Sequence, residues 1–178
     1  MIILVGPSAS GKTEIAKLLI KNYGFSKFVT TTTRDIRVGE VNDIDYHFIS
    51  AQDFERYIKE NKFIEYVVYN ANFYGTYKNE ISDEKVLIVE PKGLKAFNDL
   101  KDNHIISFFI DSPKEVRESR MFARKDKPED IYKRLSLDDV YFEESKNQVN
   151  FIITNDGEKS LEEVTKIIFE KYNSLLKK

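Results

Sequence analysis

The residues with the clearest chemistry lie within the first thirteen positions of the chain, where they match the phosphate-binding pattern G-x-x-x-x-G-K-[ST]. Glycines in such a loop let backbone N–H groups turn inward around a phosphate, and the start of a following helix adds positive potential. The lysine can bridge the β- and γ-phosphates, and the next hydroxyl can ligate Mg²⁺. The sequence therefore predicts an ATP-type triphosphate site at Gly6, Pro7, Ser8, Ala9, Ser10, Gly11, Lys12 and Thr13, with Thr13 as the metal ligand.

The segments beside this loop have the patterns that such a site requires. Residues 1–5 form a continuous apolar run, which is typical of a strand buried on both faces of a parallel sheet. From Lys12 the apolar residues recur at helical spacing until Gly24. Further buried strands are expected at 86–89, 105–110 and 151–153, with helical patterns between them. This alternation predicts an α/β fold with a parallel sheet.

Helix starts and irregular segments complete the expected organisation. Ser112 with Glu115 and Ser160 with Glu163 have the spacing of capping boxes. The segment 29–77 breaks the α/β alternation, with short strands expected at 46–49 and 63–69 and a short helix near Phe54, so we interpret it as an insertion. The charged segment 117–134 is interpreted as a mobile connection between helical patterns.

Composition limits the classes of partner. With 28 Lys+Arg against 30 Asp+Glu the net charge is −2, whereas a dedicated nucleic-acid binder usually carries excess positive charge. The absence of cysteine excludes disulfides and thiolate zinc sites. No apolar stretch approaches the roughly 18 residues of a membrane span. We expect a single cytoplasmic domain over 1–178 without nucleic-acid or membrane partners, frayed only at Lys177 and Lys178.

A second group of motifs, between residues 30 and 76, resembles the guanylate kinase family. That family shows a hydroxyl residue, Thr-Thr-Arg, a second arginine three residues later, Gly-Glu-Val and Asp-Tyr-x-Phe. All of these occur here at the same spacing within residues 30–48. The resemblance continues through 63–65, 72–76, three later arginines and 153–156, so it spans nearly the whole chain.

The resemblance implies a three-layer P-loop NTPase core with a parallel sheet, built from about 1–29, 83–118 and 140–178. Into this core are inserted a GMP-binding region, about 30–82, and a lid, about 119–139. Two guanidiniums can hold the dianionic phosphate of a nucleoside monophosphate, and a carboxylate can accept two hydrogen bonds from the guanine edge. The implied GMP-binding residues are Thr30, Arg34, Arg37, Tyr46, Glu65, Tyr74, Gly75, Thr76 and Glu90.

The same resemblance implies a lid that neutralises charge on the transferring phosphoryl group. The implied catalytic residues are Lys12, Arg34, Arg120, Arg124 and Arg134, and Asn155 is implied to contact ATP. One position departs from the family pattern, because Ile88-Val89-Glu90 stands where Asp-x-Asp is usual. Glu90 could hold a magnesium water or a substrate group, or it could cap Lys92 or the following helix.

The implied reaction is transfer of the γ-phosphoryl group of ATP to GMP, and also to dGMP, with Mg²⁺ as cofactor, in a monomer or homodimer. Two alternatives stay open. One is a related P-loop kinase for another phosphorylated acceptor such as a ribose bisphosphate, although that acceptor has no guanine edge for Glu65 and Thr30 to read. The other is a non-catalytic binding module, against which the intact Lys12 and Thr13 argue.

Overall fold

The structure, a computed structural model, describes residues 1–176, so the predicted fraying at Lys177 and Lys178 lies outside the described residues. Within 1–176, no helix is both long and apolar enough to cross a membrane. The elements in chain order are β1 (Ile2–Val5), α1 (Lys12–Tyr23), β2 (Ser26–Lys27), β3 (Thr31–Thr32), β4 (His47–Phe48), α2 (Ala51–Lys59), β5 (Phe63–Tyr69), β6 (Asn72–Tyr77), η1 (Lys78–Glu80), β7 (Lys85–Ile88), α3 (Pro91–Asn98), β8 (Ile106–Asp111), α4 (Lys114–Ala123), α5 (Pro128–Glu143), η2 (Glu144–Gln148), β9 (Phe151–Thr154) and α6 (Leu161–Leu176).

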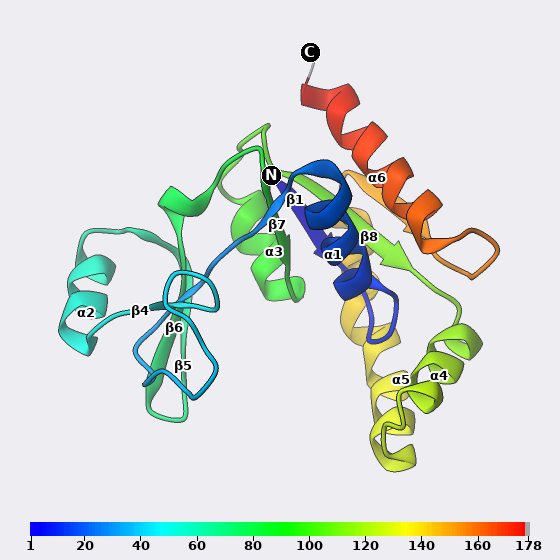
Figure 1. The fold of residues 1–178 in the computed structure, drawn as a ribbon, viewed down its shortest axis with the longest axis horizontal. Helices are drawn as coiled ribbons and strands as arrows, with labels where there is room; N and C mark the ends of the chain where they lie inside the picture. The colour runs from blue at the N-terminus through cyan, green and yellow to red at the C-terminus, as the bar shows by residue number, and fades with distance from the viewer. Residues whose placement is uncertain (177–178) are drawn as a thin grey trace.

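A central parallel sheet with strand order β2-β7-β1-β8-β9 forms the middle layer (Figure 1). The apolar run at the start of the chain alternates between two cores. Ile2 and Leu4 pack with residues of α1 and α6 on one face, and Ile3 and Val5 pack with residues of α3 on the other. The run is continuous because both faces of β1 are buried, which confirms the predicted three-layer α/β architecture.

A second, smaller sheet with strand order β4-β3-β6-β5 lies beside the core, with α2 against it (Figure 1). In Figure 1 this sheet projects to one side of the central sheet, while α4 and α5 project to the other. Its interior is aromatic, since the ring of Phe54 stacks on Phe63 at 4.2 Å and on Phe73 at 5.0 Å between centroids. The strands predicted at 46–49 and 63–69 are present as β4 and β5, whereas β3 and β6 were not predicted.

Two local predictions were wrong. The segment 117–134 is helical for most of its length, because α4 continues to Ala123 and α5 begins at Pro128. Proline suits that first helical position, where no N–H donor is needed. Ser112 does not cap α4; its Oγ instead accepts a hydrogen bond from Arg120 Nη1 at 3.2 Å. The box at Ser160 does form, with its hydroxyl donating to the Glu163 carboxylate and accepting from the Glu163 N–H.

Gly75 tests the packing of the second sheet. A Cβ at this position would lie 2.8 Å from ring carbons of Phe54 and Phe63. Gly75→Ala should therefore lower the free energy of unfolding by about 1–3 kcal/mol, the usual effect of overpacking, as measured by urea denaturation. Val68→Ala on the neighbouring strand is the control, since that side chain is 61% exposed and should change stability by less than about 0.5 kcal/mol. Equal stability of the Gly75 and Val68 variants would contradict this packing.

Candidate active site

The phosphate-binding loop lies directly against the carboxyl end of the central sheet. Gly6 has φ 144°, and a Cβ there would lie 2.6 Å from the carbonyl oxygen of Ile110 in β8. A Cβ on Gly11, which has φ 105°, would overlap the side-chain amide of Asn155. Both glycines are therefore required by close approach as well as by backbone conformation. The loop is fixed where ligands of open α/β sheets bind.

Asn155 and Arg120 form hydrogen bonds with backbone carbonyl groups of this loop. Asn155 is buried, and its Nδ2 donates to the carbonyl oxygen of Ser10 at 2.8 Å. Arg120 donates to the carbonyl oxygen of Ala9 at 3.2 Å and to Asn155 Oδ1 at 3.1 Å. Through this hydrogen bond to Ser10, Asn155 stabilises the conformation of the loop.

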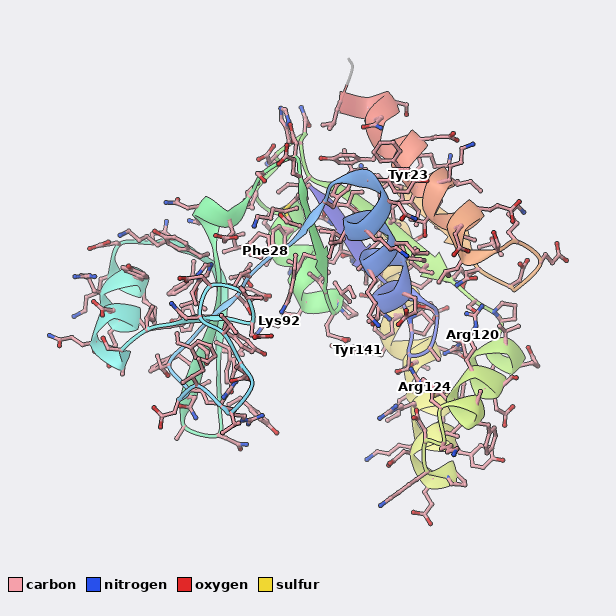
Figure 2. The ribbon with its side chains drawn as sticks, in the orientation of Figure 1. Tyr23, Phe28, Lys92, Arg120, Arg124 and Tyr141 are labelled. Atoms are coloured by element: carbon pink, nitrogen blue, oxygen red, sulfur yellow. The ribbon has the colours of Figure 1, made fainter. Side chains whose placement is uncertain are left out.

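A cavity of about 310 Å³ opens between the P-loop, α1 and α4. It is lined by Ala9, Gly11, Lys12, Thr13, Glu14, Arg120, Ala123 and Arg124. Figure 2 shows Arg120 and Arg124 extending from α4 beside this loop. Two of the three predicted lid arginines are therefore already at the P-loop.

Arg124 and Arg134 share one carboxylate. Arg124 Nη2 donates to Asp126 Oδ2 at 2.8 Å, and Arg134 Nη1 donates to the same oxygen at 3.2 Å. Arg134 does not line the cavity at the P-loop. In this conformation Asp126 holds the two arginines together in the turn between α4 and α5.

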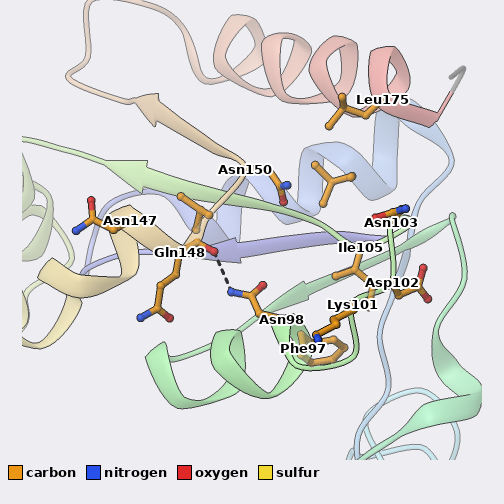
Figure 3. A pocket seen from close by; sticks show the side chains of 12 residues that line it. Phe97, Asn98, Lys101, Asp102, Asn103, Ile105, Asn147, Gln148, Asn150 and Leu175 are labelled. Atoms are coloured by element: carbon orange, nitrogen blue, oxygen red, sulfur yellow. Dashed lines mark hydrogen bonds between the residues drawn. The ribbon is translucent and has the colours of Figure 1, made fainter.

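A second cavity, of about 620 Å³, lies at the opposite end of the central sheet (Figure 3). It is lined at the amino ends of β8 and β9 by Ile105, Ile106 and Asn150, and by amide side chains such as Asn98 and Gln148. None of the predicted site residues lies there. The volume of a cavity therefore does not identify the candidate active site. The polar groups of the P-loop identify it.

Lys12 is held by two backbone carbonyl oxygens of its own loop. Its ammonium donates to the carbonyl oxygens of Gly6 at 2.6 Å and Pro7 at 2.7 Å. Burial lowers the pKa of Lys12 to about 8, and the neighbouring carboxylates of Glu90 and Asp138 limit this decrease. The lysine is therefore poorly solvated before any phosphate binds, which favours its pairing with an anion.

The residues predicted to bind the phosphate of GMP gather at the second sheet, except for the side chain of Arg37. Arg34 lies over the rings of Tyr46 and Phe48, at 5.6 and 5.5 Å from their centroids, and the ring of Tyr74 lies 6.2 Å from that of Tyr46. The Arg34 guanidinium donates to both carboxylate oxygens of Glu40, at 2.7 and 3.0 Å. Arg37 is exposed, and its backbone N–H donates to the same carboxylate. The structure brings Arg34 and the two tyrosines together, but not the Arg37 side chain.

The predicted base-reading residues lie on adjacent strands of this sheet. Glu65 in β5 pairs with Thr76 in β6, and Thr30 directly precedes β3, which pairs with β6. The Glu65 carboxylate reaches the first turn of α3, where a Cβ on Gly93 would lie 3.2 Å from Glu65 Oε1. Burial raises the pKa of Glu65, and the ammonium of Lys92 opposes that shift. Gly75 precedes Thr76 in β6, and a Cβ there would point into the aromatic packing of Phe54 and Phe63.

Glu90 precedes α3 at the N-cap position but makes no side-chain capping bond. Burial raises the pKa of Glu90, while Lys12 lowers it and Asp138 raises it further. Of the uses that the sequence left open for Glu90, helix capping is therefore not observed. Its carboxylate lies near enough to the P-loop lysine for each charge to shift the pKa of the other.

Sequence reasoning missed three charged residues of the site. Glu40 was present in the Gly-Glu-Val motif, and its position three residues after Arg37 was the available signal. Lys92, labelled in Figure 2, and Asp138 are distant in sequence from the residues they influence. Only the packing of α3 and α5 against the loops brings them to the site.

Known proteins resemble this chain in sequence over nearly its whole length. A model of the guanylate kinase family matches residues 1–171. The curated guanylate kinases of Fusobacterium nucleatum and Prochlorococcus marinus are 35% and 36% identical to the chain; each alignment covers 94% of this chain, and 95% and 96% of those relatives. The chain belongs to the guanylate kinase family.

The fold agrees with that assignment. The solved guanylate kinase of Anaplasma phagocytophilum has a TM-score of 0.65 at 23% identity, over 98% of this chain and 84% of that one. Guanylate kinases are nucleoside monophosphate kinases, and this chain is an enzyme of that class. Neither a ribose-bisphosphate kinase nor a non-catalytic module is favoured by these relatives.

The partly buried Lys12 predicts a specific pH dependence of the free energy of unfolding. Between about pH 8 and the unfolded-state pKa near 10.4, the unfolded chain binds a proton that the folded chain has lost. Lys12 should therefore make the free energy of unfolding rise with pH across this window, by at most about 3 kcal/mol.

Urea denaturation at a series of pH values measures this contribution. Lys12→Met should reduce the rise and stabilise the nucleotide-free protein at pH 7, because a buried charge is removed. Lys21→Met on the exposed side of α1 is the matched control and should keep the wild-type slope. Parallel pH curves for wild type and Lys12→Met would contradict the depressed pKa.

Proposed function

We propose that this chain transfers the γ-phosphoryl group of ATP, bound at the P-loop, to GMP, bound on the second sheet. The observation that carries this proposal is the position of the first turn of α3. Glu90, at its start, lies near enough to Lys12 of the P-loop for the two charges to interact, and a Cβ on Gly93, within it, would lie 3.2 Å from Glu65 Oε1. One helical turn therefore separates the proposed donor and acceptor sites, which suits direct in-line transfer without a covalent intermediate.

On the donor side, backbone N–H groups of the P-loop and the Lys12 ammonium are proposed to bind the phosphates of ATP. Among residues 1–176, no group of three or more His, Asp or Glu side chains could hold a metal ion by itself. This fits Mg²⁺ that is bound chiefly by nucleotide phosphates and water, since Mg²⁺ needs only one or two protein oxygens. Thr13 would supply a hydroxyl ligand, Glu90 would hold a metal-bound water, and the ion would neutralise phosphate charge.

On the acceptor side, Arg34 is proposed to bind the GMP phosphate together with the hydroxyls of Tyr46 and Tyr74. The Arg34 guanidinium is preorganised, because the Glu40 carboxylate and the rings of Tyr46 and Phe48 fix its orientation. Arg37 is exposed in this conformation, so its proposed phosphate contact requires the 34–46 loop to move toward the substrate.

For the base, Glu65 is proposed to accept hydrogen bonds from guanine N1–H and N2–H₂, with Thr30 and Thr76 as further hydroxyl partners. The burial that raises the pKa of the Glu65 carboxylate also makes it unfavourable to leave this group without a hydrogen-bond donor. A bound base that supplies donors is therefore favoured over one that does not. Neither contact involves the ribose 2′-hydroxyl, so we propose that dGMP is also used.

During transfer, Arg120, Arg124 and Arg134 are proposed to neutralise charge spreading over the phosphoryl oxygens. Arg120 and Arg124 line the cavity at the P-loop, whereas Arg134 must leave Asp126 to reach it. Closure of α4 and α5 would exclude water, which otherwise competes with GMP for the phosphoryl group. We further propose that the enzyme works in the cytoplasm as a monomer or homodimer.

Base selectivity tests this function. A site built around two donors on guanine should favour GMP over AMP by roughly 10⁴-fold in kcat/KM, because AMP presents an acceptor at N1 to the carboxylate. Glu65→Gln should lower kcat/KM for GMP and narrow the GMP/AMP ratio, because the amide offers one acceptor oxygen in place of two. IMP, which lacks the 2-amino group, should fall between GMP and AMP and lose less than GMP on mutation.

A coupled assay of ADP formation with each monophosphate measures these ratios. Glu55→Gln, an exposed residue of α2 in the same region, is the matched control and should leave them unchanged. Equal efficiency for GMP and AMP in the unmodified protein, or an unchanged ratio in Glu65→Gln, would show that Glu65 does not read the base. No faster ADP formation with GMP than without an acceptor would remove the proposed reaction itself.

A further inference from the structure

A carboxylate from the lid lies on the P-loop. Asp138 belongs to α5, and its Oδ2 accepts a hydrogen bond from the backbone N–H of Ser8 at 2.6 Å. The side chain is only 13% exposed. Ser8 is the third residue of the phosphate-binding pattern, so its N–H belongs to the set that the loop offers to phosphate oxygens.

Asp138 is held in this position from behind by a buried arginine. Arg117 of α4 lies 3.9 Å, Nη1 to Oδ2, from Asp138, and its Nη2 pairs with the neighbouring Asp139. The Arg117 side chain is 3% exposed, and Nη1 makes no hydrogen bond of its own. Its charge is therefore available to hold Asp138 against the loop.

Asp138 also interacts electrostatically with two further charged groups near the loop, Lys12 and Glu90. It stabilises the ammonium of Lys12, and it opposes ionisation of Glu90. The carboxylate thus contacts one phosphate-binding group and lies near the lysine that reaches the β- and γ-phosphates. The Ser8 N–H and the Lys12 ammonium are groups that would also favour an anionic terminal phosphate at this position.

We propose that Asp138 is a positioning residue that takes the place of the donor's terminal phosphate in the nucleotide-free protein. A single N–H cannot fully serve two anionic acceptors, and the carboxylate and the phosphate repel each other at short range. Binding of ATP therefore displaces Asp138 from Ser8 and frees α5 from the P-loop. ADP lacks the terminal phosphate and leaves Asp138 in place, so α5 distinguishes the donor from its product.

This inference rests on the proposed donor site, and the experiment separates the two. Dissociation constants for ATP and for ADP are measured by calorimetric titration, with excess Mg²⁺ and without GMP, on the full chain. Asp138→Asn keeps an acceptor oxygen for Ser8 but removes the charge. Asp139→Asn is the matched control, because Asp139 also pairs with Arg117 but makes no bond to the loop.

Asp138→Asn should bind ATP roughly tenfold more tightly than wild type while its ADP affinity changes by less than about threefold, since one nearby like charge is removed. Asp139→Asn should keep the wild-type ratio of ADP to ATP dissociation constants. On the unmodified protein, the ¹³C resonance of the Asp138 carboxyl group should shift on adding ATP and stay in place with ADP, a readout that needs no variant.

An unchanged ratio in Asp138→Asn, or the same change of ratio in Asp139→Asn, would overturn the inference and leave Asp138 as an anchor of α5 only. A carboxyl resonance that responds equally to ATP and ADP would also overturn it. Failure of the unmodified protein to bind either nucleotide would instead overturn the donor site, and this inference with it.

Discussion

The close contact between the P-loop and the ends of β8 and β9 is the constraint on which the rest of the site depends. At Gly6 the loop backbone approaches the carbonyl oxygen of Ile110, and at Gly11 it approaches the amide of Asn155, with no room for a side chain at either position. Asn155 and Arg120 then bond to the loop carbonyls. Because the loop is packed in this way, the start of α1 and the Lys12 ammonium have one defined place relative to the sheet.

That rigidity has an electrostatic consequence. Lys12 is directed at two loop carbonyls and is buried enough that its pKa decreases to about 8. The carboxylates of Asp138 and Glu90 oppose this decrease. The site is thus a cluster of charges that are incompletely solvated until an anion binds, which is how electrostatic preorganisation lowers stability while serving catalysis. The two acids keep the lysine charged without matching the geometry of a polyphosphate.

The sequence was informative where one periodicity or one motif determines the structure. The apolar run of β1 predicted a strand buried on both faces, and the loop pattern predicted the start of α1 at Lys12, because each depends on neighbours in sequence. Prediction failed where contacts with residues distant in sequence determine the structure. Ser112 has the spacing of a capping residue, but Arg120 takes its hydroxyl. The charged run 117–134 was interpreted as a mobile connection, yet Arg117 within it is buried and pairs with Asp138 and Asp139 on another helix. Asp138 itself carries no local signal.

The central claim is that donor and acceptor bind at once, ATP at the P-loop and GMP on the second sheet, on either side of the first turn of α3. A guanosine and an adenosine joined through a short polyphosphate chain test it most directly by calorimetric titration. Linking two bound groups makes the second binding event intramolecular, so this compound should bind 10²- to 10⁴-fold more tightly than ATP or GMP alone. An affinity no greater than that of ATP would contradict the account, because the two sites would then not be adjacent in the enzyme.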